Sequence, residues 1–393
     1  MIRRARPKYL ENIDIDKIIN LQTKKNEDFY FDRGSSAFRF LLESLQFFYD
    51  KNLTVCIQSF NCNTVLDAAL NVNNIKVIFS DVKLSDFSIS LDFIKENAKK
   101  IDILFLLHYQ GKINIEYEEI IDFCRINKII VIEDLAHIAE NSFAFKGDYG
   151  IYSYSFDKPF TCFSGGKIVF NNTQNRFLDM FEERYKKLEY ENIKKTKLDL
   201  QLLKYFNNYS TTELYMQRAD NQQIVKVLLN FLPMNFLYRL LKNKFFGLPI
   251  KIIFRILFKL FPKLIQENYI PQRIIDNKIK LIEEQKTNYS IFNNKYKQIQ
   301  KNIIDKLNTT YNFEIDKNTD WNRLSFLDEN KRIKLKNIEY GNFNWSLPLN
   351  KTYKDNKKIE FIGNYDNTNF LSKNIINFPI WSEEIIKEID DDK

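Results

Sequence analysis

Residues 129–137 read Ile-Ile-Val-Ile-Glu-Asp-Leu-Ala-His, and residues 147–167 read Gly-Asp-Tyr-Gly-Ile-Tyr-Ser-Tyr-Ser-Phe-Asp-Lys-Pro-Phe-Thr-Cys-Phe-Ser-Gly-Gly-Lys. The first stretch is an apolar run that ends in two acids, which is typical of a strand buried on both faces. The second combines serines, a lysine and a Gly-Gly pair within a short distance. The two stretches predict that Asp134 lies at a strand end and that the following chain brings Lys158 back to it.

The residues on either side of the first stretch alternate between two patterns. Short apolar runs typical of buried strands alternate with longer segments of helical periodicity. This alternation predicts an α/β fold, in which helices cover both faces of a mainly parallel sheet and ligands bind at the carboxyl ends of the strands. Both histidines, His108 and His137, fall just past predicted strands. The predicted strands are Leu53–Ile57, Lys76–Phe79, Ile101–Leu107 and Ile129–Ile132, and the predicted helices are Phe38–Tyr49, Thr64–Val72, Leu91–Lys99 and Tyr117–Asn127.

The second half of the chain follows other patterns. Residues 176–285 have helical character, and residues 310–393 mix short strands and turns before a helix over Ser382–Asp390. The Asn-rich stretch 288–308 is expected to be a loop. We therefore expect a large domain over residues 1–185, a helical insert over 186–268 and a smaller C-terminal α+β domain over 269–393.

Composition and charge exclude several classes of protein. The chain has 393 residues, is 44% hydrophobic and has a net charge of +8, and its composition is that of a globular protein. Four cysteines without CxxC spacing and only two histidines favour neither a disulfide framework nor a metal site. No apolar segment follows the basic N-terminus, so a cytoplasmic location is expected. The excess positive charge is confined to one segment, which argues against nucleic acid as a partner.

That segment, residues 224–265, alternates apolar and cationic residues. Its cations Lys251, Arg255, Lys259 and Lys263 recur every four residues and would form a basic stripe beside an apolar helix face. The segment lacks the charge-free run of about 18 residues that a membrane span requires. It is either a helix at the interface of a membrane with anionic lipid, or a lid or dimer arm that packs on protein.

The residues of the stretches 129–137 and 147–167 suit a pyridine ring that carries a phosphate. Asp134 would pair with the protonated ring nitrogen, and His137 would contact the ring or its oxygen. Lys158 would form a Schiff base with the aldehyde of pyridoxal phosphate (PLP). Each residue alone has an ordinary alternative: a strand-ending cap, a buried structural histidine and a solvated surface lysine. The combination favours the cofactor.

A phosphate site is also visible upstream. Gly34-Ser35-Ser36-Ala37 lies directly before the predicted Phe38 helix. Small residues at this position let backbone amides and a hydroxyl reach a phosphate at the N-terminus of a helix. The ordinary alternative is a helix N-cap after a glycine turn.

These motifs resemble the DegT/DnrJ/StrS sugar aminotransferases, PLP enzymes of the aspartate-aminotransferase fold type. Members carry a stretch like V-I-E-D-A-A-H/Q, then G-D-x-x-x-F-S-F-x-x-x-K-x-x-T-x-G-x-G-G. Residues 131–137 and 147–166 are similar to these two stretches. Further similar segments are the phosphate loop at 34–37, Ser59-Phe60-Asn61-Cys62, Leu107-His108-Tyr109-Gln110-Gly111, Pro271-Gln272-Arg273 with the helix that runs to Tyr289, and Asn377-Phe378-Pro379-Ile380.

The resemblance implies a homodimeric enzyme with its active site at the subunit interface. It would transfer an amino group, usually from L-glutamate, to a keto group of a nucleotide-activated sugar for surface polysaccharide or glycan biosynthesis. By position, the resemblance gives the following roles: Lys158 as Schiff-base lysine, Asp134 as partner of the ring nitrogen, His137 at the ring oxygen, Ser153, Ser35, Gly34 and Ser36 at the phosphate, Phe60 or Cys62 over the ring, and His108 and Arg273 as substrate contacts.

Two departures from the family pattern keep alternatives open. Phe163 replaces the first Gly of the G-x-G-G turn, so we expect this loop not to adopt its usual Gly-only conformation. Pro271 replaces an Asn that in the family reaches the partner's phosphate. One alternative is therefore a catalytically degenerate homologue that acts as a membrane-associated binding or scaffold subunit. Another is a PLP-dependent sugar dehydratase, although members of that kind carry histidine in place of the lysine.

Overall fold

The computed structural model describes residues 9–208 and 270–391, except 11, 21–27, 141, 172–173, 317–321, 339, 342–344 and 346. The basic segment 224–265 lies outside the described residues, so its membrane and protein-packing alternatives both stay predictions. Within the described part, no helix is both long and apolar enough to cross a membrane. The same residues contain no cluster of three or more His, Cys, Asp or Glu side chains suited to a metal ion.

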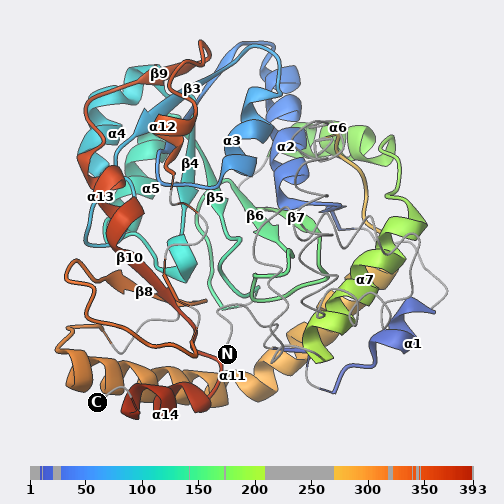
Figure 1. Ribbon diagram of the computed structural model, residues 1–393. Helices are drawn as coiled ribbons and strands as arrows, with labels where there is room; N and C mark the ends of the chain where they lie inside the picture. Colours follow the sequence, from blue (N-terminus) through green and yellow to red (C-terminus); the bar gives the residue numbers. More distant parts are fainter. Residues whose placement is uncertain are drawn as a thin grey trace, which may run out of the picture.

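An eight-stranded sheet forms the centre of the large domain (Figure 1). Its strand order is β1-β7-β6-β5-β4-β2-β3-β9, and every neighbouring pair from β6 to β9 is parallel. Strands β1 and β7 add two antiparallel pairings at one edge. The strands are β1 (Tyr30–Phe31), β2 (Leu53–Gln58), β3 (Ile75–Ser80), β4 (Ile103–Leu107), β5 (Ile130–Asp134), β6 (Tyr149–Ser153), β7 (Gly166–Phe170) and β9 (Ile359–Phe361).

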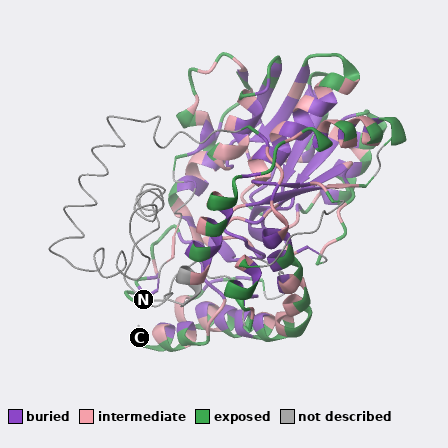
Figure 2. Ribbon diagram, turned by 90° about the vertical axis from the view of Figure 1, so that its right-hand side faces the viewer, coloured by how far each residue is buried: buried purple, intermediate pink, exposed green. Residues whose placement is uncertain are grey.

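Helices cover both faces of this sheet because successive strand residues point to opposite sides. Val55 and Ile57 of β2 pack in one cluster with helices α2, α3 and α6, whereas Cys56 between them packs in another with α4 and α5. Figure 2 shows the resulting buried strands between partly exposed helices. The helices are α2 (Gly34–Tyr49), α3 (Asn63–Leu70), α4 (Leu91–Asn97), α5 (Tyr117–Ile126) and α6 (Asn175–Lys186), with short 3-10 turns η1 (Ala98–Lys100) and η2 (Tyr109–Gly111).

The predicted α/β fold is confirmed, and the predicted elements lie within a few residues of the observed ones. The largest difference concerns α2, which begins at Gly34 and not at Phe38. Gly34, Ser35 and Ser36 therefore form the first turn of the helix itself. Arg33 occupies the N-cap position, and no side chain caps the helix.

A second body lies below the large sheet in Figure 1 and is built around one long helix. Residues 288–308, which we expected to be a loop, lie inside α11 (Asp276–Tyr311), so that prediction is wrong. The buried residues Ile299, Ile303 and Leu307 of α11 have helical spacing, and this packing outweighs the weak helix propensity of asparagine. The remaining elements are α1 (Ile15–Ile19), α7 (Ile193–Asn208), β8 (Leu324–Leu327), α12 (Leu349–Thr352), α13 (Asp366–Asn374), β10 (Ile375–Phe378) and α14 (Glu384–Asp390).

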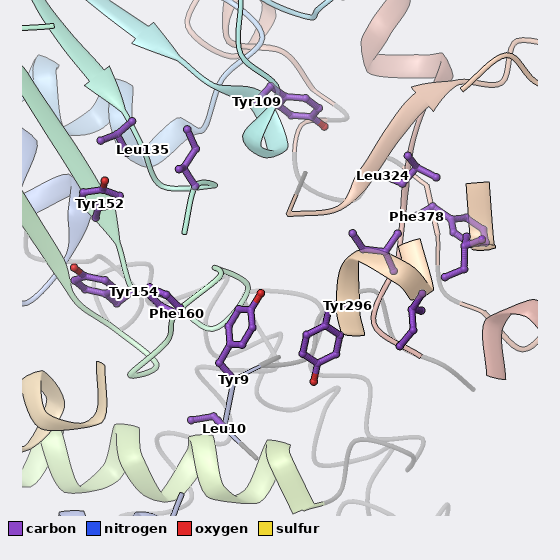
Figure 3. Packing of buried hydrophobic residues seen from close by; sticks show 14 of the residues in the cluster. Tyr9, Leu10, Tyr109, Leu135, Tyr152, Tyr154, Phe160, Tyr296, Leu324 and Phe378 are labelled. Atoms are coloured by element: carbon purple, nitrogen blue, oxygen red, sulfur yellow. The ribbon is translucent and has the colours of Figure 1, made fainter. Parts of the chain in front are cut away.

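The C-terminal part is tied closely to the large sheet. Strands β8 and β10 pair antiparallel in a sheet of their own, but β9 joins the large sheet beside β3. A single hydrophobic cluster spans both bodies, and Figure 3 shows members from the large domain, the N-terminal segment, α11 and the small sheet. The predicted domain limits stay a prediction, and the structure adds that the C-terminal unit contributes a strand to the large domain.

Candidate active site

The candidate residues gather at the carboxyl ends of three neighbouring parallel strands. Asp134 is the last residue of β5, Ser153 is the last residue of β6, and His108 directly follows β4. Strands β4, β5 and β6 are adjacent in the sheet, so these ends meet at one edge. The sequence prediction that they lie together at this edge agrees with the observed topology.

Asp134 is buried and has few polar partners. Its carboxylate accepts a hydrogen bond from the backbone N–H of Ala136 at 3.0 Å. Burial raises the pKa of Asp134, while the nearby Lys158 acts in the opposite direction. A buried carboxylate with one described hydrogen bond is suited to receive a cationic group, such as a protonated ring nitrogen.

His137 and Lys158 contact each other directly, although the two residues are 21 positions apart. Lys158 Nζ lies 2.9 Å from Nε2 of His137, and the backbone N–H of Gln110 donates to Nδ1 at 3.2 Å. Burial holds the pKa of His137 well below its usual value of 6.5, so the ring is neutral. Because Nδ1 accepts a hydrogen bond, the ring proton resides on Nε2. The contact places the amine of Lys158, the type of group that acts as a nucleophile in PLP enzymes, directly against this ring nitrogen.

The N-terminus of α2 lies against Ser153. A side chain at Gly34 would meet Cβ of Ser153 at 3.1 Å, and one at Gly166 would meet the backbone of Arg33 and Gly34 at 2.5 Å. Both glycines therefore allow the end of β6 and the start of β7 to approach the helix. The helix has no side-chain cap, and the hydroxyl of Ser36 is buried without a hydrogen-bond partner among the described residues. These are the features of an anion site at a helix N-terminus.

The loop between Lys158 and Gly166 contradicts one sequence prediction. Phe163 has φ of 72°, so this residue adopts the left-handed conformation that we expected phenylalanine to prevent. Such a backbone costs about 1–2 kcal/mol for a residue with a Cβ. The loop is held by other contacts: the N–H of Phe163 donates to Oγ1 of Thr161, and Thr161 exchanges two hydrogen bonds with the Gln285 amide. Phe163 is 6% exposed, and its burial compensates for the strained backbone.

Phe60 and Cys62 were alternatives for the residue over the ring. Phe60 is fully buried and packs edge-to-face on Trp345 with ring centroids 5.1 Å apart. Cys62 is half-buried, at the N-cap position of α3, with its sulfur 3.1 Å from the hydroxyl of Thr64. The structure places both at the carboxyl side of β2, and which of them covers a ring stays a prediction.

His108 has structural partners. Its Nε2 lies 2.7 Å from Oε2 of Glu133, and its ring packs against Tyr117 and Phe143. The side chain is 0% exposed, so it presents no surface to a sugar. Nε2 is used by Glu133, Nδ1 is buried without a hydrogen-bond partner among the described residues, and the substrate role of His108 stays a prediction.

Arg273 lies beside the first strand of the sheet. Its backbone bonds to residues 189 and 191, and its guanidinium stacks on Tyr190 at 3.9 Å from the ring centroid. The preceding residue Gln272 accepts a hydrogen bond from the N–H of Asp32, directly before the N-cap of α2. The segment that contains Pro271 and Arg273 thus lies near the phosphate end of the site, and the substrate role of Arg273 stays a prediction.

Several residues at the site were missed in the sequence. Asn322 donates its backbone N–H to the carbonyl of Gln110, and Arg323 donates to both the carbonyl and Oδ2 of Asp157 at 3.2 Å. Trp345 lies 6.2 Å from the ring of His137. These residues are more than 150 positions from Lys158 and belong to no recognisable motif, so only the tertiary structure brings them to the site.

Residues 31–194 match the family model described as the DegT/DnrJ/EryC1/StrS aminotransferase family. This stretch is similar to that family. Residues 31–194 contain every candidate residue of the site except Arg273. The matching family is PLP-dependent. The predicted family resemblance and cofactor class are thereby confirmed.

Solved structures extend the likeness to nearly the whole chain. A putative sugar aminotransferase from Streptococcus pneumoniae in its PLP form is 15% identical, with a TM-score of 0.56 over 99% of this chain and 91% of that chain. An E coli GDP-4-keto-6-deoxy-D-mannose-3-dehydratase with bound hydrated PLP is 13% identical, with a TM-score of 0.57 over 98% and 92%. DesI in the presence of its TDP-sugar product is 9% identical, with a TM-score of 0.57 over 95% and 81%. At these identities the likeness shows the fold.

The residues present fit PLP. The uncapped α2 N-terminus and the unpartnered Ser36 hydroxyl suit the phosphate, and the poorly satisfied Asp134 suits the ring nitrogen. His137 Nε2 and Lys158 Nζ lie next to each other, as the neighbouring oxygen and aldehyde substituents of the ring require. The residues at both ends of the site therefore match the two ends of the cofactor.

Proposed function

We propose that this protein is a PLP-dependent aminotransferase that moves an amino group from L-glutamate to a keto group of a nucleotide-activated sugar. The observation that carries the proposal is the 2.9 Å contact between the amine of Lys158 and the N–H of His137, beside the buried carboxylate of Asp134. A nucleophilic amine and a buried carboxylate at one sheet edge are the two groups that PLP chemistry needs from a protein.

Each residue has a separate task in this reaction. PLP supplies the electron sink that lets an amino group leave one carbon and reach another. Asp134 would keep a proton on the ring nitrogen, and His137 would orient the ring through its oxygen. The first turn of α2 and the hydroxyl of Ser153 hold the phosphate. The amine of Lys158 would hold the cofactor at its aldehyde, and it is the group placed to move protons at the substrate carbon.

Lys158 also distinguishes this function from its main alternative. One of the structures with this fold is a sugar dehydratase, and dehydratases of this kind would carry histidine in place of the lysine. This chain carries lysine, which supports amino transfer. We further propose a homodimer whose partner completes the site, a cytoplasmic location and a role in surface polysaccharide or glycan biosynthesis.

The test compares Lys158→Ala with Lys146→Ala, a control lysine that is exposed and paired with Glu118. We expect wild-type protein and Lys146→Ala to show a visible PLP absorption band that shifts on addition of L-glutamate, with release of 2-oxoglutarate. Lys158→Ala should lose the band and at least a thousandfold in transfer rate, since the nucleophile is absent. Borohydride reduction and peptide mapping should locate the cofactor on Lys158.

Two outcomes would contradict the proposal. A Lys158→Ala spectrum identical to that of the wild type would remove the lysine from the mechanism. A wild-type protein that takes up no PLP would instead favour the binding or scaffold alternative. Turnover of the keto sugar without formation of 2-oxoglutarate would favour the dehydratase.

A further inference from the structure

Helix α11 contacts the loop that follows Lys158 at two points. Gln285 accepts a hydrogen bond from the backbone N–H of Thr161 at 3.0 Å and donates one to the carbonyl oxygen of the same residue at 2.8 Å. About two helical turns earlier, Lys278 donates to the hydroxyl of Ser164 at 2.9 Å. Residues seven positions apart lie on the same face of an α-helix, so one face of α11 holds the loop at both Thr161 and Ser164.

Lys278 is fully buried and retains its charge. Its amine lies 2.9 Å from Oε2 of Glu191 and 2.8 Å from Oδ2 of Asp199 in α7, and both carboxylates are buried as well. Burial by itself would lower the pKa of Lys278, but Asp199 and Glu191 raise it above its usual value. The hydroxyl of Ser164 in turn donates to Oδ2 of Asp199 at 2.6 Å. Ser164 is therefore held by both members of a buried ion pair, which tolerates few other arrangements.

The held loop is strained, and its end lies against the N-terminus of α2. Phe163, between the two contact points, has φ of 72°, and such a backbone persists where the surrounding structure fixes it. Two residues after Ser164, a Cβ on Gly166 would lie 2.5 Å from backbone atoms of Arg33 and Gly34. The contacts with α11 therefore fix the segment against which the first turn of α2 packs.

We infer that Lys278 and Gln285 are positioning residues for the phosphate of the cofactor; this inference rests on the proposed function. They act through the loop that they hold. With Thr161 and Ser164 fixed, Gly166 keeps the first turn of α2 where its backbone N–H groups meet a phosphate. The phosphate site is then formed before the cofactor arrives, so binding does not have to order the loop.

The test measures binding of PLP and of pyridoxal, which lacks the phosphate, to the cofactor-free full-length protein by calorimetry. Ser164→Ala removes the hydroxyl that Lys278 holds and leaves the ion pairs of Lys278 in place. Gln285→Leu removes both hydrogen bonds to Thr161. We expect each substitution to weaken PLP about tenfold and to leave the affinity for pyridoxal unchanged, because only the phosphate depends on the held loop.

Two substitutions on the exposed side of the same helix are matched controls. The hydroxyl of Ser290 donates to the carbonyl of Thr287, and the amide of Gln298 donates to Asn302. We expect Ser290→Ala and Gln298→Leu to leave both affinities unchanged.

Hydrogen exchange of the cofactor-free protein gives a second measurement. The N–H of Phe163 donates to the hydroxyl of Thr161 at 3.1 Å, inside the held loop. We expect its exchange to become about tenfold faster in Ser164→Ala and Gln285→Leu, because the loop opens more often.

An equal loss of affinity for PLP and pyridoxal would overturn the inference, since a general structural role weakens both. Unchanged PLP affinity, or unchanged exchange at Phe163, in Ser164→Ala and Gln285→Leu would also overturn it. Failure of the proposed function has a different signature. Loss of PLP affinity in these two variants, together with a wild type that transfers no amino group to a keto sugar, would keep the inference and reject the aminotransferase. A wild type that binds no PLP would reject both.

Discussion

Glu133 and Asp134 are neighbours on one strand, yet their surroundings differ completely. Glu133 is fully buried and accepts from the Tyr117 hydroxyl at 2.8 Å, from two backbone N–H groups of residues 146 and 147, and contacts His108 at 2.7 Å. Asp134 accepts one described hydrogen bond, from the backbone of Ala136. Successive side chains of a strand point to opposite faces, so the two carboxylates lie in different layers of the domain.

The different surroundings of Glu133 and Asp134 imply different roles for the two carboxylates. A buried carboxylate that is surrounded by donors stabilises the fold, because each of those donors would otherwise be unpaired. A buried carboxylate with few donors is a cost to the folded state, and such a cost persists where a ligand offsets it. Substitutions at Glu133 and Asp134 test whether the two carboxylates divide these two roles.

The largest effect is expected from Asp134→Asn. The amide has nearly the same shape but cannot stabilise a protonated ring nitrogen, so we expect amino transfer to slow by about 10²- to 10⁴-fold. The free energy of unfolding at pH 7 should not decrease. The folded-state pKa of Asp134 is raised, so the ionised carboxylate opposes folding at this pH, and the substitution removes that opposition. Transfer rates and urea unfolding of the cofactor-free protein measure the two effects.

Glu133→Gln is the matched change on the other face, and its effect should fall on stability. Its NH2 group meets donors where the carboxylate accepts from Tyr117 and the two backbone N–H groups, and an amide turned toward His108 removes the charge that these groups bind. We expect unfolding in urea to become about 1–3 kcal/mol easier, because a buried donor loses its acceptor. A loss of transfer rate as large as that of Asp134→Asn, without loss of stability, would erase the distinction between the two carboxylates.

His137 should give the smallest effect, visible as a pH dependence of stability. The folded-state pKa of His137 lies well below 6.5, so the unfolded chain binds its proton more readily. The stabilising contribution is present above pH 6.5 and is lost as pH falls, at up to about 1.4 kcal/mol per pH unit. His137→Gln keeps an acceptor for the N–H of Gln110 but does not titrate. Urea unfolding at pH 7.5, 6.5 and 5.5 should show the difference between the two proteins shrinking toward acid, and parallel profiles would contradict a neutral buried His137.

The sequence predicted the large domain well because its signals are local. Apolar runs of strand length, helical periodicity and short loops fixed the order of elements from residue 34 to 170, and with it the placement of Asp134, Ser153 and Lys158 at one sheet edge. The same local rules failed where packing overrides propensity. The Asn-rich stretch within α11 is helical because Ile299, Ile303 and Leu307 are buried, and Phe163 adopts a left-handed backbone because its ring is buried.

The chain therefore determined by itself where the candidate residues Asp134, His137 and Lys158 lie along the fold, since a strand end and the loop after it are encoded within some thirty residues. Only the tertiary structure decided what surrounds them. The contact between His137 and Lys158, the donors around Glu133 and the approach of Arg323 to Asp157 join segments separated by 13 to 166 positions. Contacts at such separation depend on how whole elements pack, and no local pattern of residue types records them.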